Sequence, residues 1–369
     1  DRVAVRLCAD GRFDLEDRRT GMRYEGLNAL EDVEDVGDEY DFSPAAEGLL
    51  VAATGERGTL HVVDEGGLKG ALEARFVLSL PARIAANRRW RVEEHIDCPV
   101  RVQLTLETGS PVVDVDVRFD NRAEDHRLVA RFPTGIATDT VVSDAHFLLA
   151  RRPVDPPDDA DWCQPAPDTV PQQELSAVSD AERGLAVLVR GLPEVAALRR
   201  EDGTIDLRLT LLRAVGWLSR DDFPTRRCQN AGPTIATPDA QCLGPQRFRY
   251  AVLPFAGDVL DADVKGWSRR WRTPLPCVQG VLDGGAPGGA GLVATSSGRT
   301  SVTAIKTHEE RDTLVVRLVN LASEPVDETL RFGLELAAAW RVDLHEGREE
   351  DLPLEDPRTL RVALRPHEI

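Results

Sequence analysis

The chain has 369 residues, of which 42% are hydrophobic, and it carries a formal net charge of −18 at pH 7. This length suits one large domain followed by a smaller one, with enough apolar residues for a core in each. The negative charge argues against nucleic acid and anionic membrane surfaces as partners, because both attract clustered Lys and Arg.

Alternating apolar and polar residues dominate the chain from its start. Residues 3–27 alternate around two short Gly-containing turns, as a hairpin or meander would. Residues 101–121 form the clearest case, since two alternating runs flank the turn sequence TGSP. Further strand patterns cover 74–84, 206–218 and 247–255. We therefore predict an all-β fold of long antiparallel strands in two large packed sheets.

The remaining segments are a short helix, two loops and a second β region. Residues 261–272 have helical spacing over a few turns. Residues 151–173 are rich in Pro and Asp, which excludes a central strand, and the Gly-rich segment 280–293 is typical of a linker. Strand patterns then resume and continue to the C-terminus as a smaller β-sandwich. We predict a large domain over 1–276 and a small one over 277–369.

The sequence offers no metal or cofactor motif. The six cysteines lie far apart, without the close spacing of a zinc site, so we expect mostly buried, reduced thiols. His95 and Asp97 form an isolated His-x-Asp pair within a strand pattern, and no second ligand pair lies near them. No apolar run reaches membrane-spanning length and no signal peptide is present. We expect a cytoplasmic protein that binds no cofactor of its own.

Two polar loops are the candidate binding segments. The first, GDEYDFSP (37–44), crowds three acids around one of only three tyrosines in the chain. Like charges so close repel each other unless they are solvated or paired. The second, 213–244, combines Arg, Asp, Gln and Asn with Pro and Gly. Such a loop suits hydrogen bonding to a polyhydroxylated ligand, and it suits a structural loop with Arg–Asp pairs equally well.

Several of these segments together resemble the C-terminal β-domain of glycoside hydrolase family 38, the α-mannosidases, especially bacterial members. The matching segments are 11–27, 37–44, 209–244, 301–325 and 362–369, and they are spread over most of the chain in the expected order. The resemblance implies a galactose mutarotase-like supersandwich followed by a small β-sandwich. It also implies that this chain is part of a longer zinc-dependent retaining α-mannosidase.

In that family the zinc ligands and the catalytic Asp lie in an N-terminal α/β domain. The resemblance therefore implies that this chain contributes no catalytic residue and no metal ligand, and that alone it hydrolyses nothing. Its expected partners are that catalytic domain and an α-mannoside. Tyr40 matches a family tyrosine that approaches the bound sugar, and Arg227 and Asn230 are nominated from the second loop. Their expected role is to hydrogen-bond sugar hydroxyls.

Two alternatives stay open at this point. The chain could be purely structural, or a carbohydrate-binding module that does not contribute to catalysis. It could also be a free-standing mutarotase-like enzyme, which needs a histidine and a carboxylate acting across a sugar ring. His95, His126 and His146 are the histidines available for that role.

Overall fold

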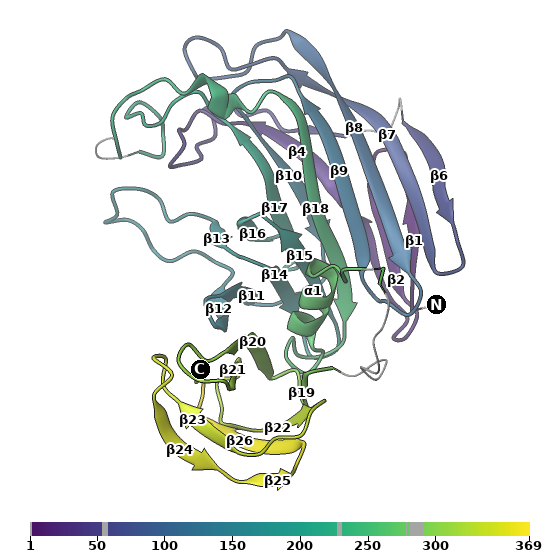
Figure 1. Ribbon diagram of the computed structural model, residues 1–369. Helices are drawn as coiled ribbons and strands as arrows, with labels where there is room; N and C mark the ends of the chain where they lie inside the picture. The colour runs from purple at the N-terminus through teal and green to yellow at the C-terminus, as the bar shows by residue number, and fades with distance from the viewer. Residues whose placement is uncertain (1, 54–57, 227–230, 278, 281–290) are drawn as a thin grey trace. The chain divides into compact units, whose positions relative to one another are not determined.

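The computed structural model describes every residue except 1, 54–57, 227–230, 278 and 281–290, which Figure 1 draws in grey. The described residues form two compact units. The first consists of residues 1–143 and 151–257, and the second of residues 144–150 and 258–369. Each unit is described below by itself.

Within the described residues, three antiparallel sheets account for the strands up to residue 255 (Figure 1). The three-stranded sheet has the order β1 (Val3–Leu7), β2 (Phe13–Asp17), β3 (Met22–Leu27). The six-stranded sheet has the order β13 (Thr169–Pro171), β16 (Glu194–Arg199), β17 (Ile205–Ala214), β10 (His126–Pro133), β4 (Ala29–Glu34), β5 (Val51–Ala52). The nine-stranded sheet has the order β12 (Leu148–Pro153), β11 (Thr140–Ala145), β14 (Leu175–Ser179), β15 (Gly184–Arg190), β18 (Gly244–Phe255), β9 (Val113–Asn121), β8 (His95–Glu107), β7 (Lys69–Pro81), β6 (Thr59–Glu65).

The alternation over 101–121 produces the predicted hairpin. Strands β8 and β9 pair with Val102 opposite Val117 and Leu104 opposite Val115, and all four side chains are buried. Because successive side chains of a strand point to opposite faces, one face of this pair enters the core and the other meets solvent.

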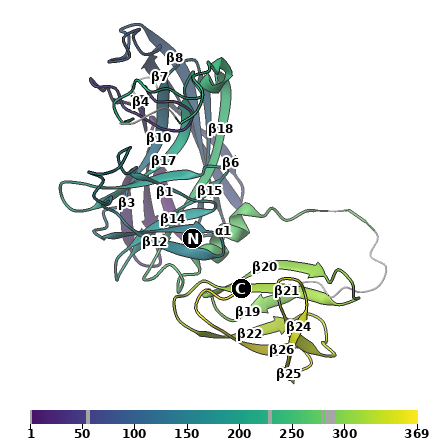
Figure 2. The ribbon, with the colours of Figure 1, turned by 90° about the vertical axis from the view of Figure 1, so that its left-hand side faces the viewer.

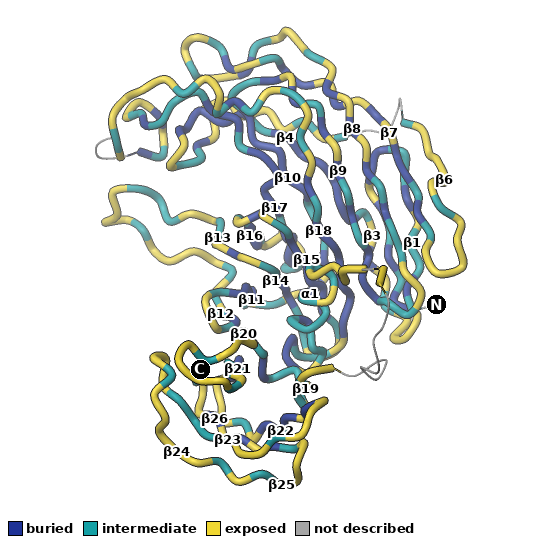
Figure 3. Tube along the Cα trace, in the orientation of Figure 1, coloured by how far each residue is buried: buried dark blue, intermediate teal, exposed yellow. Residues whose placement is uncertain are grey.

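One hydrophobic core lies beneath all three sheets. It joins Leu104 of the nine-stranded sheet, Leu128 of the six-stranded sheet and Phe13 of the three-stranded sheet. The rings of Phe132 and Tyr250 meet edge to face at 5.9 Å between these layers. Figure 3 shows the buried residues concentrated on β9, β10, β17 and β18. The sheets therefore pack face to face as one large antiparallel sandwich.

The second unit contains the one α-helix within the described residues and several short sheets (Figure 2). The helix is α1 (Val264–Arg272), and a 3₁₀ turn, η1 (Pro238–Gln241), precedes it in the first unit. The strands form the sheets β19 (Val293–Thr295), β22 (Val326–Phe332), β26 (Thr359–Leu364), β25 (Leu354–Asp356); β20 (Thr300–Thr307), β21 (Leu314–Asn320); and β23 (Ala339–Val342), β24 (Arg348–Leu352).

A buried carboxylate fastens the start of this β region. Glu328 on β22 accepts hydrogen bonds from the hydroxyls of Ser296, Ser297 and Thr300 and from the Ser296 N–H. Burial pushes the pKa of Glu328 upward, but these four donors outweigh it and hold the pKa below its usual range. The ionised carboxylate therefore stabilises the second unit.

The prediction of an all-β fold, with a large antiparallel sandwich followed by a small one, is confirmed. The short helix expected within 261–272 is present as α1. The boundary between residues 276 and 277 stays a prediction. The cysteine prediction is corrected, since Cys163 is disulfide-bonded and, of the four free cysteines in the described part of the chain, only Cys98 is fully buried. Among the described residues, no helix is long and apolar enough to cross a membrane.

Candidate functional site

Strand register brings the two predicted loops to the same end of the six-stranded sheet. Strands β4 and β17 both pair antiparallel with β10, so they run parallel to each other. His126 on β10 lies opposite Glu34 on one side and Ala214 on the other. The segments that follow, 35–44 and 215–226, therefore leave the sheet side by side, on the left in Figure 1.

A buried ion pair joins these loops at their base. Arg213 Nε donates to Asp35 Oδ2 at 2.8 Å, and the N–H groups of Gly37 and Ser43 donate to Asp35 Oδ1 at 3.0 and 3.2 Å. Complete burial raises the pKa of Asp35, against the effect of Arg213. A Cβ at Gly37 would stand 2.0 Å from the carbonyl oxygen of Asp41, so only glycine fits this turn.

A second buried ion pair lies at the centre of the loop. Arg226 Nη1 lies 3.0 Å from Asp38 Oδ2, and both side chains are 0% exposed. Asp38 also accepts the N–H groups of Tyr40 and Asp41 at 3.0 Å each and that of Arg220 at 2.8 Å. A buried carboxylate with this many donors is fully satisfied. Asp38 is therefore a structural residue that holds the backbone on both sides of Tyr40.

Asp41 ties a third loop to the other two. Its Oδ2 accepts hydrogen bonds from Arg226 Nη2 and, at 2.7 Å, from Gln164 Nε2 in the loop between β12 and β13. Arg226 continues to Ser219 Oγ at 3.1 Å and packs its guanidinium over the Phe223 ring at 4.6 Å. The crowded acids of 37–44 are thus mostly paired with cations, and Glu39 is the exposed exception.

Tyr40 is the exposed aromatic side chain of this loop. It is 54% exposed, and its hydroxyl has no hydrogen-bond partner within the described part of the chain. Its ring lies against Gly232, where an added Cβ would come within 3.1 Å of Oη and 3.4 Å of Cε2. Tyr40 is therefore held by backbone bonds and by a close neighbour, with its hydroxyl free. Arg227 and Asn230 lie outside the described residues.

The three histidines considered for a mutarotase-like acid–base role lie in three separate environments. His126 is fully buried, with Nδ1 2.5 Å from Asp32 Oδ2 and Nε2 2.9 Å from Asn121 Oδ1, so it cannot reach a sugar ring. His95 is exposed on β8, with Nδ1 2.9 Å from the carbonyl oxygen of Glu93. His146 is exposed in a turn that groups with the second unit. Over the described residues, no three His, Cys, Asp or Glu side chains gather in a way that could hold a metal ion.

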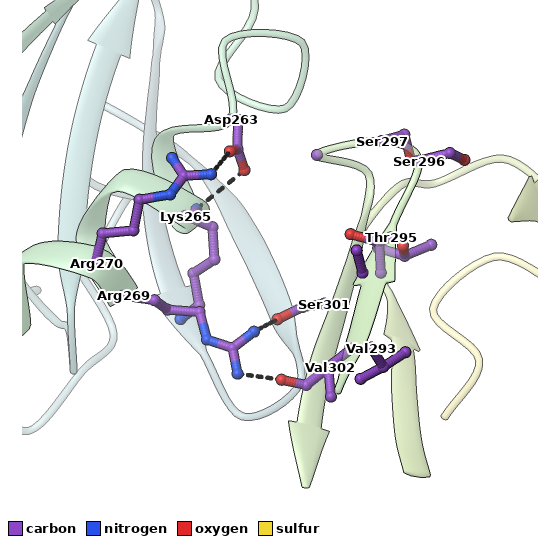
Figure 4. Close-up of a pocket in the computed structure, with 14 residues that line it drawn as sticks. Asp263, Lys265, Arg269, Arg270, Val293, Thr295, Ser296, Ser297, Ser301 and Val302 are labelled. Carbon is purple, nitrogen blue, oxygen red and sulfur yellow. Dashed lines mark hydrogen bonds and ion pairs between the residues drawn. The ribbon is translucent and has the colours of Figure 1, made fainter. Parts of the chain in front are cut away.

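A separate hollow lies in the second unit, between α1 and the segment 293–302 (Figure 4). Its charged side chains already have partners. Arg269 Nη1 donates to Ser301 Oγ at 2.8 Å, and Arg270 Nη2 donates to Asp263 Oδ2 at 3.0 Å. Arg269 thus fastens α1 to β20, while Arg270 pairs with the residue that caps the start of α1, and we assign this hollow a structural role.

Reasoning from sequence missed Arg226 and Gln164, which build the site. The mix of Arg, Asp, Gln and Asn in 213–244 indicates a polar binding loop, and the residues nominated from it are Arg227 and Asn230. Charge balance could have pointed to Arg226, because the acids of 37–44 need buried cations and the second loop supplies them.

Comparison with known proteins covers almost the whole chain. Residues 4–239 match the family described as "Glycosyl hydrolases family 38 C-terminal domain", and residues 300–369 match its "C-terminal beta sandwich domain". A putative mannosylglycerate hydrolase from Halalkalibacterium halodurans is 31% identical over 278 residues, which are 71% of this chain and 29% of that protein. Alpha-mannosidase 2C1 from Mus musculus is 26% identical over 379 residues, covering 98% of this chain and 31% of that protein.

A solved structure shows the same fold. The alpha-mannosidase from Enterococcus faecalis V583 superposes with a TM-score of 0.82 at 22% identity, over 97% of this chain and 41% of that chain. The chain thus spans less than half the length of each of these relatives. Because the first family match alone covers well over half of the sequence, the chain belongs to glycosyl hydrolase family 38, of which it carries the C-terminal domains.

Proposed function

We propose that this chain is the C-terminal part of a zinc-dependent retaining α-mannosidase, and that loop 37–44 forms one wall of its sugar-binding cleft. In this proposal Tyr40 hydrogen-bonds a hydroxyl of the bound mannoside, and Arg227 and Asn230 assist from the second loop. One observation carries the proposal. Tyr40 presents a hydroxyl that has no hydrogen-bond partner among the described residues, from a backbone that Asp38 and Arg226 hold in place.

A rigid loop is what sugar recognition requires. Each immobilised side chain or loop costs entropy on binding, so a contact that is already ordered contributes more of its energy to affinity. Asp38 fixes the N–H groups of Tyr40 and Asp41, and Gly232 limits the ring of Tyr40. The hydroxyl can therefore meet a sugar with little further ordering.

The same contacts give Asp35 and Asp38 a structural role rather than a catalytic one. A retaining glycosidase needs a free carboxylate as nucleophile and a carboxylic acid as proton donor. Asp35 and Asp38 are fully buried in ion pairs with Arg213 and Arg226. They cannot attack a glycosidic carbon, so the chain by itself is expected to be inactive.

The described residues do not fit a zinc site, because they contain no suitable ligand cluster. None of the roles proposed for residues of this chain therefore involves the metal. We assign zinc and the nucleophile to the N-terminal catalytic domain of the same polypeptide, which is also the proposed partner of this chain.

The proposal is tested by Tyr40→Phe in the full-length enzyme, with an aryl α-mannoside as substrate. Losing one hydrogen bond of about 1–1.5 kcal/mol lowers kcat/KM by roughly five- to tenfold. Tyr24→Phe is the matched control, because Tyr24 is buried and donates its hydroxyl to the Gly184 carbonyl at 2.9 Å. The control should lose stability but keep its kinetics.

Unchanged kinetics in Tyr40→Phe would contradict the proposal. They would favour a structural or separate carbohydrate-binding role for the chain.

A further inference from the structure

The loop between β12 and β13 carries a large aromatic side chain that the proposed function does not use. Trp162 is 50% exposed in this loop, which projects from the same side of the first unit as the segments 35–44 and 215–226 (Figure 1). A single exposed aromatic residue is unremarkable by itself. Its position relative to Tyr40 gives it significance.

Contacts on both sides of Trp162 fix its segment. The Trp162 N–H donates to the Asp159 carbonyl at 2.9 Å, and the Ala166 N–H donates to Asp159 Oδ2 at 2.7 Å. The next residue, Cys163, is disulfide-bonded. The indole therefore stands on a braced turn, although half of its surface faces solvent.

The same segment contacts the Tyr40 loop. Gln164, two residues after Trp162, donates to Asp41 at 2.7 Å, and Asp41 follows Tyr40 directly in the chain. Asp41 in turn pairs with the buried Arg226. One carboxylate thus couples the segment that carries Trp162 to the segment that carries Tyr40, and both side chains are exposed.

We propose that Trp162 is a stacking platform for a second sugar ring, the one linked to the mannose at Tyr40. This inference rests on the proposed function. An aromatic ring offers a flat apolar face with little conformational entropy to lose, and a pyranose offers a matching face of C–H groups. Trp162 thereby sets a preference for α-mannosides whose leaving group is itself a sugar.

The charge around Trp162 indicates which leaving groups are favoured. The loop contains five acidic residues, Asp155, Asp158, Asp159, Asp161 and Asp168, and Asp161 is the exposed neighbour of the indole. An anionic leaving group would meet repulsion here, whereas a neutral saccharide can donate its hydroxyls to a carboxylate. The site therefore selects a neutral sugar ring.

The test uses the full-length enzyme with two substrates that share the mannose but differ in the leaving group. α-Mannosyl fluoride has no second ring, and α-linked mannobiose has one. Trp162→Ala should lower kcat/KM about tenfold for mannobiose and leave it unchanged for the fluoride. Trp162→Phe should retain most of the activity on mannobiose. Leu68→Ala, which removes an exposed apolar side chain from the β6–β7 turn, is the control and should change neither.

An equal effect of Trp162→Ala on both substrates, or no effect on either, overturns the inference. A second readout needs no turnover, namely the affinities for a thio-linked mannobiose, which resists hydrolysis, and for mannose, measured by calorimetry. The wild type should bind the thio-linked mannobiose more tightly, and Trp162→Ala should abolish that difference. If the wild type shows no such difference, the inference fails even where Tyr40→Phe lowers activity, so the two proposals fail separately.

Discussion

Replacing Arg226 by methionine is expected to release the loop that carries Tyr40. The substitution keeps much of the aliphatic volume of the side chain but removes its charge and its hydrogen bonds. Asp38 then stays buried with three N–H donors and no cation, and Asp41 keeps only Gln164 among the partners described above.

The free energy lost in Arg226→Met follows from the burial of the ion pair between Asp38 and Arg226. Both side chains are 0% exposed and their charged atoms are 3.0 Å apart, so neither is compensated by solvent once the other is removed. Breaking a buried pair in this way costs about 3–5 kcal/mol. Because opening the loop hydrates Asp38, the cost appears first as local opening of this segment. The opening equilibrium should therefore rise by roughly two to four orders of magnitude.

Amide hydrogen exchange of peptides spanning residues 37–44 measures this opening in the full-length protein. The control is Arg199→Met, since Arg199 also pairs with two carboxylates, Asp139 and Asp155, but on the surface. Exposed pairs contribute little, so exchange in the control should match the wild type. Asp38→Asn added to Arg226→Met should restore part of the protection. An increase in exchange below about tenfold in Arg226→Met would refute the reasoning.

Two further predictions concern the second unit and the neighbour of Tyr40. The pKa of Glu328 is held below its ordinary value of 4.5, so its ionised form stabilises the fold above that pH and this contribution is lost as the pH falls through the lowered pKa. Melting temperatures should show a deficit in Glu328→Gln at pH 6 that shrinks below pH 4.5; a deficit independent of pH would argue against this. Gly232→Ala should displace the Tyr40 ring by a few tenths of an ångström and lower kcat/KM severalfold without changing the melting temperature. Gly67→Ala, where an added Cβ meets no atom within 4 Å, is its control, and equal kinetics in both variants would count against a positioning role for Gly232.

The alternation and spacing of apolar residues predicted the strands and the helix, because this periodicity is set by residues that are close together in the sequence. The alternation over 101–121 requires one buried face, and β8 and β9 provide it. The helical spacing near Trp267 likewise appears as α1. Such periodicity reports burial directly, since a strand repeats every two residues and a helix every 3.6.

The site could be predicted only in part because its contacts join distant segments. Asp38 and Arg226 are 188 residues apart, and Gln164 and Asp41 are 123 residues apart. No local pattern identifies which arginine of 213–244 is buried. The family resemblance identified Tyr40, but it did not show that the acids beside it hold the loop. The expectation of reduced thiols was wrong at Cys163 for the same reason, since a disulfide joins residues that spacing does not relate.

The central proposal is that the catalytic centre lies outside this chain. It is tested most directly by comparing the full-length protein with this chain alone. Hydrolysis of an aryl α-mannoside and bound zinc should be measured on the full-length protein and on residues 1–369 expressed alone. We expect the full-length protein to hydrolyse the substrate and to contain about one zinc per chain. We expect residues 1–369 to do neither. Hydrolysis by residues 1–369, or one tightly bound zinc in them, would contradict the assignment of the catalytic centre to the N-terminal domain.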